Sequence, residues 1–297
     1  MIFDRKEKPE EATEAPPYTQ ATPTQPGPAF RTTFACMSMN STDLLRLIQF
    51  PPEPARIVRN AITQSWPRGI KEERDYHGAH EFKLKGNPWS GQGSEAVPSR
   101  IFMCQILADL YNAGWVLFAS TDISKNGMDK DSCLFRYQQP APPPCSWMSI
   151  SFNRGDRLRL IGAPQEIIAP FGRVMGSLLQ KEGLIEHGAY EFKCKGWPWY
   201  AMGGDTVATR ILLLRMLELL ESFGFSLYAS IDQSIGVSQY HCSTEYFAEH
   251  PALTFRLVEM GRPARRTPGT AAGSSAGRLV PPFSTEMTAA VDLGVQS

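Results

Sequence analysis

The chain has 297 residues, of which 42% are hydrophobic, and its formal net charge at pH 7 is +0. This length and apolar content suffice for two domains with cores of about 100 residues each. A balanced charge gives no whole-chain attraction to phosphate groups, so it argues against a dedicated nucleic-acid or membrane-surface protein.

Both ends of the chain have few large apolar residues. Residues 1–32 are rich in Pro, Thr, Gln and Glu, and residues 262–297 are rich in Gly, Ala, Ser and Pro. We predict that both are disordered tails. The N-terminal tail lacks an apolar signal region, and the longest apolar run, residues 211–220, contains Arg215 and Glu218. We therefore expect neither a secretion signal nor a membrane span.

The first predicted domain, residues 33–140, begins with a β-hairpin around residues 37–48, where apolar and polar residues alternate. A first helix at residues 51–66 starts with prolines that suit a first turn. The strand EFKLKG and a Pro-Trp loop then lead to a second helix at residues 95–112, which Gly114 would cap. Two strands, WVLFASTD and SCLFRYQ, complete the domain.

The same elements return in residues 146–261. The segment YHGAHEFKLKGNPW, residues 76–89, corresponds to EHGAYEFKCKGWPW, residues 186–199, at a constant offset in residue number. A Pro-rich segment, APPPC at 141–145, is predicted to link the copies. We therefore predict an α+β fold of two tandem ββαβαββ repeats, each a mixed or antiparallel sheet with its helices on one face.

The segments EFKLKGNPW, ASTDIS and SCLFR resemble parts of uncharacterised eukaryotic proteins, largely fungal, that carry such a repeat after a Pro-rich start. The resemblance covers roughly residues 34–260. It implies no activity, ligand or catalytic residue.

Alternation along the strands separates an apolar face from a polar one in each sheet. In the second repeat, the residues expected to face the helices are Leu158, Leu160, Phe192, Leu227, Ala229, Ile231, Leu253, Phe255 and Leu257. The opposite face is polar and leans basic, and a Trp lies in each Pro-Trp loop. The candidate binding residues are Lys83, Lys85, Trp89, Arg136, Arg157, Arg159, Lys193, Lys195, Trp199 and Arg256.

Two interpretations of these residues stay open. The basic face is suited to an acidic protein segment, an anionic ligand or nucleic-acid phosphate, and an exposed Trp is suited to a protein contact. Alternatively, the face is solvated, with carboxylates paired to Lys and Arg across strands, and each Trp folds over its own core.

A catalytic alternative rests on a His four residues before a Glu in each repeat, as in His77 and Glu81. Together with a Ser-x-Asp sequence at Ser120 or Ser230, these residues suit the acid-base or acyl-transfer chemistry of a hydrolase or transferase. The sequence has no GxSxG elbow, and the Pro-Trp loops have no GK[ST] for a nucleotide phosphate.

The six cysteines show no CxxC spacing, so we expect reduced thiols and no zinc site. The preferred interpretation is a non-enzymatic binding protein of the cytoplasm or nucleus that needs no cofactor. Its partner would be a protein or an anionic ligand, with nucleic acid less favoured.

Overall fold

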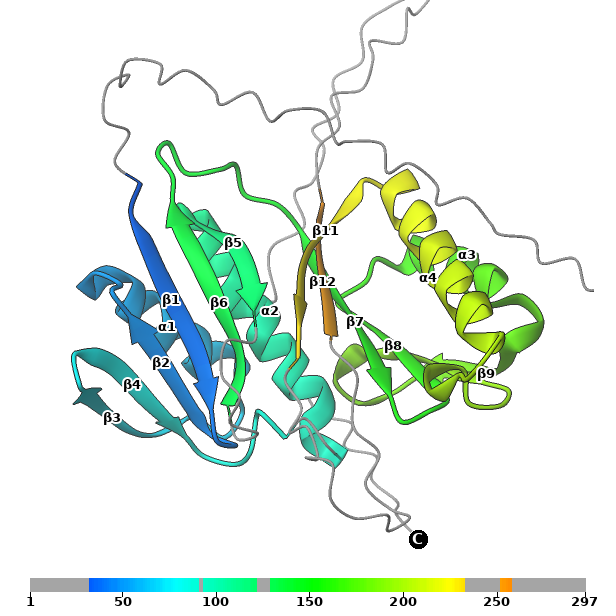
Figure 1. Cartoon of the computed structure of the whole chain (residues 1–297), viewed down its shortest axis with the longest axis horizontal. Helices are drawn as coiled ribbons and strands as arrows, with labels where there is room; N and C mark the ends of the chain where they lie inside the picture. The colour runs from blue at the N-terminus through cyan, green and yellow to red at the C-terminus, as the bar shows by residue number, and fades with distance from the viewer. Residues whose placement is uncertain (1–31, 91–92, 122–128, 233–251, 258–297) are drawn as a thin grey trace, which may run out of the picture. The chain divides into compact units, whose positions relative to one another are not determined.

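The computed structural model describes residues 32–90, 93–121, 129–232 and 252–257 (Figure 1). The first repeat consists of β1 (Phe34–Asn40), β2 (Leu44–Ile48), α1 (Pro52–Ser65), β3 (Ile70–Tyr76), β4 (Ala79–Leu84), η1 (Gly93–Glu95), α2 (Ala96–Asn112), β5 (Trp115–Thr121) and β6 (Asp129–Tyr137). Both predicted tails lie outside the described residues.

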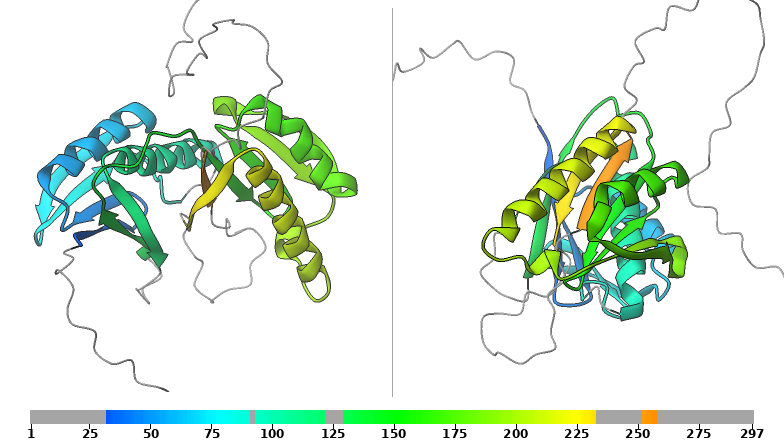
Figure 2. Two further views of the ribbon diagram at one scale, coloured as in Figure 1. Left: turned by 90° about the horizontal axis from the view of Figure 1, so that it is seen from above. Right: turned by 90° about the vertical axis from the view of Figure 1, so that its right-hand side faces the viewer.

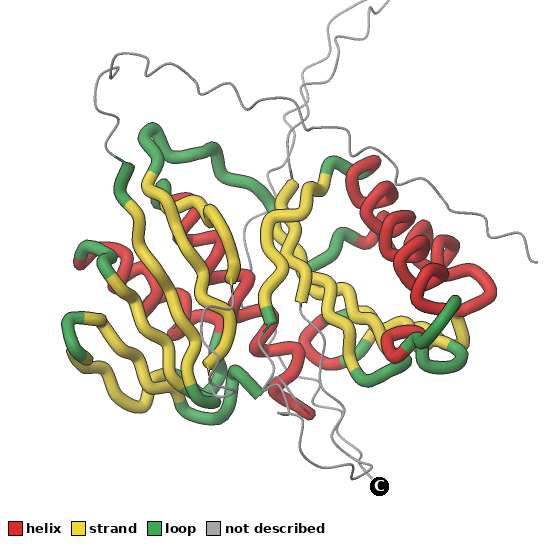
Figure 3. Tube along the Cα trace, in the orientation of Figure 1, coloured by secondary structure: helices red, strands yellow, loops and turns green. Residues whose placement is uncertain are grey.

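The second repeat has the same order of paired strands and single helices (Figure 3). It consists of β7 (Trp147–Asn153), β8 (Arg157–Ile161), α3 (Gln165–Met175), η2 (Gly176–Leu178), β9 (Leu179–Leu184), η3 (Glu186–Gly188), β10 (Tyr190–Cys194), η4 (Pro198–Tyr200), α4 (Asp205–Ser222), β11 (Phe225–Ile231) and β12 (Ala252–Leu257). No helix among the described residues is long and apolar enough to cross a membrane.

Each repeat forms one six-stranded antiparallel sheet. The strand orders are β3-β4-β2-β1-β6-β5 and, read from the other edge, β9-β10-β8-β7-β12-β11. Corresponding strands therefore occupy the same place in the two sheets, and the predicted α+β fold of two tandem repeats is confirmed. Figure 2 shows the helices of each repeat lying against one side of their own sheet.

Each sheet has one strand more than the predicted ββαβαββ order. The additional strands, β3 and β9, are edge strands that pair with β4 and β10. In β3, IKEERDY, five of the seven side chains are charged and most are exposed. Charged side chains are typical of edge strands, and they remove the apolar alternation that marks a half-buried strand.

The hairpins that open the two repeats match at an offset different from that of the Pro-Trp loops. Asn40 ends β1 and Asn153 ends β7, and each accepts a hydrogen bond from a serine two residues earlier, at 3.0 Å from Ser38 Oγ and 2.6 Å from Ser151 Oγ. The two asparagines therefore correspond, and the offset in the hairpins is slightly larger than in the rest of the repeat. On this basis Phe34 corresponds to Trp147, Cys36 to Ser149 and Ile48 to Ile161.

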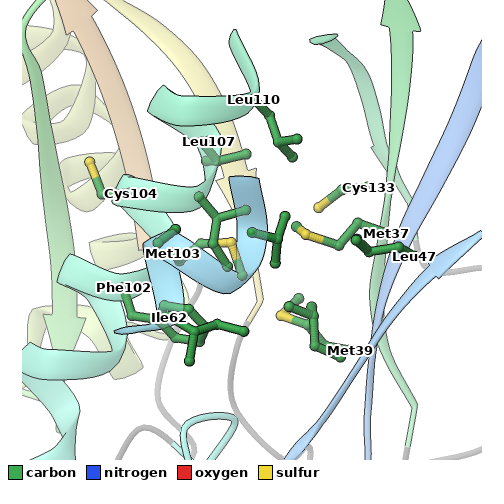
Figure 4. Packing of buried hydrophobic residues seen from close by; sticks show 14 of the residues in the cluster. Met37, Met39, Leu47, Ile62, Phe102, Met103, Cys104, Leu107, Leu110 and Cys133 are labelled. Carbon is green, nitrogen blue, oxygen red and sulfur yellow. The ribbon is translucent and has the colours of Figure 1, made fainter. Parts of the chain in front are cut away.

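The core of the first repeat lies between its sheet and the helices α1 and α2. Met37, Met39 and Leu47 from the sheet pack against Ile62 of α1 and Leu107 of α2 (Figure 4). Burial of each large apolar side chain contributes about 1.5–3 kcal/mol.

The helix α2 is buried far more completely than its counterpart α4. Thirteen of the seventeen residues of α2 are buried, whereas Met216 and Leu220 are the two buried residues of α4. The reason is that α2 has neighbours on two sides, because it packs on its own sheet and also contacts β7 and β8 of the second repeat.

Candidate protein-binding face

The side of the first sheet that faces away from α1 and α2 exposes large apolar side chains. We call it the open face. Its exposed apolar residues are Phe34, Ile48 and Phe118, and the half-buried Cys36 lies directly opposite Ile48. The rings of Phe34 and Phe118 are 5.4 Å apart in a T-shaped arrangement, and Phe118 is 61% exposed. Arg136 lies directly opposite Phe34 on the neighbouring strand, and its side chain is exposed.

The charged residues of the open face are largely paired with each other. Arg46 Nε is 2.6 Å from Glu81 Oε2, and Arg74 Nη2 is 2.7 Å from Glu81 Oε1. Burial would raise the pKa of Glu81, but the hydrogen bonds from the two arginines outweigh it and hold this pKa below its usual range. Lys83 Nζ lies 3.6 Å from Asp43 Oδ2. These pairs leave little of the basic character that the sequence predicted.

The second repeat has the same arrangement of charges. The Glu191 carboxylate accepts hydrogen bonds from Arg157 Nη1 at 3.1 Å and from Arg159 Nε at 2.9 Å. Lys193 Nζ lies 4.0 Å from Asp156 Oδ2. The predicted solvated alternative, in which carboxylates pair with arginines across strands, accounts for these contacts.

Two of the predicted lysines lie at the ends of strands. Lys85 and Lys195 follow β4 and β10, and their side chains are exposed. Their backbone amides donate to Gly69 O at 3.0 Å and Leu178 O at 2.7 Å.

The tryptophans of the Pro-Trp loops hold the loops to the hairpins. Trp89 is 0% exposed, donates from Nε1 to Leu44 O at 2.7 Å and stacks on Phe102 at 5.6 Å. The indole of Trp89 therefore has no exposed surface, in accord with the alternative that each Trp folds over its own core. The half-buried Trp199 donates in the same way to Arg157 O at 2.8 Å.

The corresponding side of the second sheet is not open, because α2 covers part of it. Tyr111 of α2 lies over a T-shaped pair formed by Trp147 and Tyr228, whose rings are 4.8 Å apart. Arg256 Nη1 donates to the Tyr111 hydroxyl at 3.1 Å, and its guanidinium lies 5.4 Å from the Tyr111 ring centre. The predicted binding residue Arg256 is thus engaged within the chain.

This covered group corresponds residue by residue to the open group in the first repeat. Phe34 and Arg136 are directly opposite each other in one sheet, as Trp147 and Arg256 are in the other. Phe118 corresponds to Tyr228 at the offset that relates the two Pro-Trp loops. Two aromatic rings and one arginine at corresponding positions are therefore covered by a helix in the second repeat and exposed in the first.

Further contacts extend along α2. Val97 packs with Ile161 and Ala189 in a small buried cluster. Cys104 hydrogen-bonds with Ser149, and burial raises the pKa of its thiol to about 12. The polar residues that this packing buries on the second sheet are Ser149, Ser151, Asn153 and Thr254.

Strand β11 departs from the predicted alternation. A β-bulge between Leu227 and Ala229 shifts the pairing with β12 by one residue. Ala229 and Ile231 therefore join the core cluster of the first repeat, not the cluster under α3 and α4, and Leu227 is exposed. The Tyr228 hydroxyl accepts a hydrogen bond from Leu117 N at 2.7 Å, which joins β11 to β5. The prediction that Ala229 and Ile231 face their own helices is wrong for this reason.

The residues of the catalytic alternative are not brought together. Glu81 on β4 and Ser120 on β5 are four strands apart in the sheet order, about 19 Å at the usual strand separation. His77 occupies the hairpin turn with a φ of 51°, and Ser120 Oγ donates to Asp131 Oδ2 at 3.2 Å. Within the described residues no cluster of three His, Cys, Asp or Glu side chains can hold a metal ion.

A shallow pocket of about 340 Å³ lies beside the start of α2, lined in part by Arg157, Arg159 and His187. Glu191 also lines it and pairs with both arginines. The pocket therefore presents little net positive charge to an anion.

A family model of a domain of unknown function matches the chain twice, over residues 33–136 and 146–248. A search of curated proteins gives no match. The double match confirms the tandem repeat, and the resemblance to fungal proteins stays a prediction.

Proposed function

The chain belongs to this domain family and carries two copies of its domain, and we propose that it is a non-enzymatic interaction protein that binds a helix of a protein partner on the open face of its first sheet. One observation carries the proposal: the corresponding face of the second sheet already binds a helix, α2, within the same chain. A helix with one apolar side is a common occupant of such a surface.

The chemistry of the open face favours a protein partner over an anion. Its central group consists of the rings of Phe34 and Phe118 beside the Arg136 guanidinium. Aromatic residues and arginine are the residue types enriched in protein interfaces and their energetic centres. The carboxylates of Glu81 and Asp43 balance the neighbouring Arg46 and Lys83. An anionic ligand or nucleic acid would therefore find few unpaired cations there.

We further propose that the protein acts in the cytoplasm or nucleus and needs no cofactor. The described cysteines are free thiols, as a reducing compartment favours. They are Cys36, Cys104, Cys133, Cys145 and Cys194.

The test is site-directed photocross-linking in a eukaryotic cell extract. The photoreactive amino acid p-benzoylphenylalanine replaces Phe118, which it resembles in shape, and in a control protein it replaces Arg56, an exposed residue of α1. We expect irradiation to join position 118 to a protein segment of helical, amphipathic sequence, and Arg136→Glu to reduce that adduct. Equal adduct yields at positions 118 and 56 would refute the proposal.

A further inference from the structure

The outward side of α4 is an apolar strip that the described part of the chain leaves exposed. Val207 is 59% and Leu214 57% exposed, and Ile211 between them is also exposed. These residues are at i, i+4 and i+7, so they form one stripe along the helix. A continuous apolar stripe on a helix surface is typical of an interaction site.

The strip occupies the positions at which α2 contacts the second sheet. At the offset that relates the two Pro-Trp loops, Val207 corresponds to Val97 and Leu214 to Cys104. Val97 and Cys104 are buried by that sheet, whereas their counterparts are exposed. The contact between α2 and the second sheet is therefore complete within the chain. The two halves of the corresponding contact, the α4 strip and the open face, are separate and exposed.

We propose that copies of this chain associate head to tail, with α4 of one copy covering the open face of the next copy as α2 covers the second sheet. This inference rests on the proposed function, because it names the helix that the open face binds. The halves match at three places along the helix.

The first match lies at the N-terminal end of the helix. Within the chain, Val97 packs on Ile161 and Ala189. In the contact between copies, Val207 would pack on Ile48, the counterpart of Ile161. Ile48 is exposed whereas Ile161 is buried, so the first sheet has a position ready for an apolar neighbour.

The second match lies at the middle of the helix. Cys104 meets Ser149 within the chain. Leu214 would meet Cys36, the counterpart of Ser149, so the hydrogen-bonded contact between Cys104 and Ser149 would be replaced by an apolar contact of a leucine with a thiol.

The third match is a charge pair. Tyr111 meets Arg256 within the chain, and the residue of α4 in the place of Tyr111 is Glu221. Arg136 is the counterpart of Arg256, so the two exposed halves carry opposite charges where they would meet.

Within the chain the two repeats are also joined by a hydrogen bond between β5 and β11, and the contact between copies would lack its counterpart. The Tyr228 hydroxyl accepts from Leu117 N, whereas its counterpart Phe118 has no hydroxyl. The two halves also belong to separate chains and gain nothing from a covalent link. The association is therefore weaker than the packing within the chain and depends on concentration. Because the two surfaces differ, it forms rings or open chains of copies and not a twofold dimer.

The experiment is sedimentation velocity on the full chain over a range of concentrations. We expect the wild type to form larger species as the concentration rises. Leu214→Asp on α4 and Phe118→Asp on the open face should each raise the dissociation constant about tenfold or more. Leu184→Asp, a matched change at an exposed leucine of β9, is the control and should leave association unchanged.

Mixing gives the sharpest result. The Leu214→Asp protein keeps its open face and the Phe118→Asp protein keeps its α4, so the two together should form a one-to-one dimer that grows no further. Glu221→Arg and Arg136→Glu should each weaken association, and mixing these two proteins should restore it. Circular dichroism establishes that each variant is folded, as expected because the replaced residues are exposed.

Several results would overturn the inference: a wild type that stays monomeric, association that the Leu214→Asp change does not affect, or mixtures that form no dimer. A monomeric protein whose position 118 still cross-links to a different protein would refute self-association and leave the proposed function standing. A monomer without such adducts would refute both. A monomer whose own chain covers α4 would also overturn the inference.

Discussion

The helices α2 and α4 occupy the same place in two copies of one domain, yet their surroundings differ. Both are apolar on more than one side, with valine and isoleucine at corresponding outward positions. In α2 the outward residues are buried by the second sheet, and in α4 they are exposed. The difference shows that duplication produced two helix surfaces and two sheet surfaces, of which one of each is used within the chain.

The largest expected effect is a difference in unfolding free energy between corresponding substitutions on the two helices. Cys104→Asp places a carboxylate in the buried contact of α2, and we expect it to lower the free energy of unfolding by about 3–5 kcal/mol. Leu214→Asp makes the corresponding change on α4 and should alter it by less than about 0.5 kcal/mol. Urea unfolding at low protein concentration, where copies are separate, measures both. Equal losses would mean that α4 is covered within the chain.

The second prediction compares Glu81 and Glu191, the carboxylates that each pair with two arginines. Glu81 is held by Arg46 and Arg74 and is more deeply buried than Glu191. We expect Glu81→Gln to cost about 1.5–3 kcal/mol of unfolding free energy near neutral pH, and Glu191→Gln to cost less.

The pH dependence of this cost has a defined sign. Because the pKa of folded Glu81 lies below its unfolded value, the stabilisation is complete above about pH 4.3 and is lost as the pH falls through the folded pKa. Urea unfolding at several pH values should show the wild type and the Glu81→Gln protein converging in acid. A difference that persists at low pH would contradict this account.

Sequence patterns predicted the parts of the fold that depend on local alternation and on internal similarity. The tandem copies, the hairpins and both helices of each copy follow from such patterns. The edge strand β3 does not, because its residues are charged and exposed. The residues of β11 could not be assigned to faces either, since the bulge after Leu227 reverses the alternation without a local signal.

The candidate site was predicted only in part. Alternation groups Arg46, Glu81 and Lys83 on one side of their strands, but spacing alone does not reveal that Glu81 and Glu191 each neutralise two arginines. Phe34 and Phe118 were missed. Aligning the hairpins on the asparagines that end their first strands would have paired Phe34 with Trp147 and indicated an aromatic position common to both copies. Which copy is covered depends on packing between repeats and is absent from any local pattern.

A smaller effect tests the hydroxyl that distinguishes the covered aromatic pair from the open one. Tyr228→Phe removes the acceptor of the Leu117 amide and should cost about 1 kcal/mol of unfolding free energy. Phe118→Tyr, the reverse change on the open face, should leave the stability of the single chain nearly unchanged. If both changes are neutral, the bond between β5 and β11 contributes nothing to joining the repeats.

The smallest expected effect concerns the lysines that first suggested a basic platform. The fourfold variant Lys83→Glu, Lys85→Glu, Lys193→Glu and Lys195→Glu removes two partly exposed ion pairs with aspartates, and surface pairs contribute about 0–1 kcal/mol each. Cross-linking at Phe118 and self-association should change less than about twofold, because an interface centred on aromatic rings loses little from charges at its rim. A large loss in this variant, together with steep salt dependence, would instead make the lysines the binding surface and favour an acidic partner.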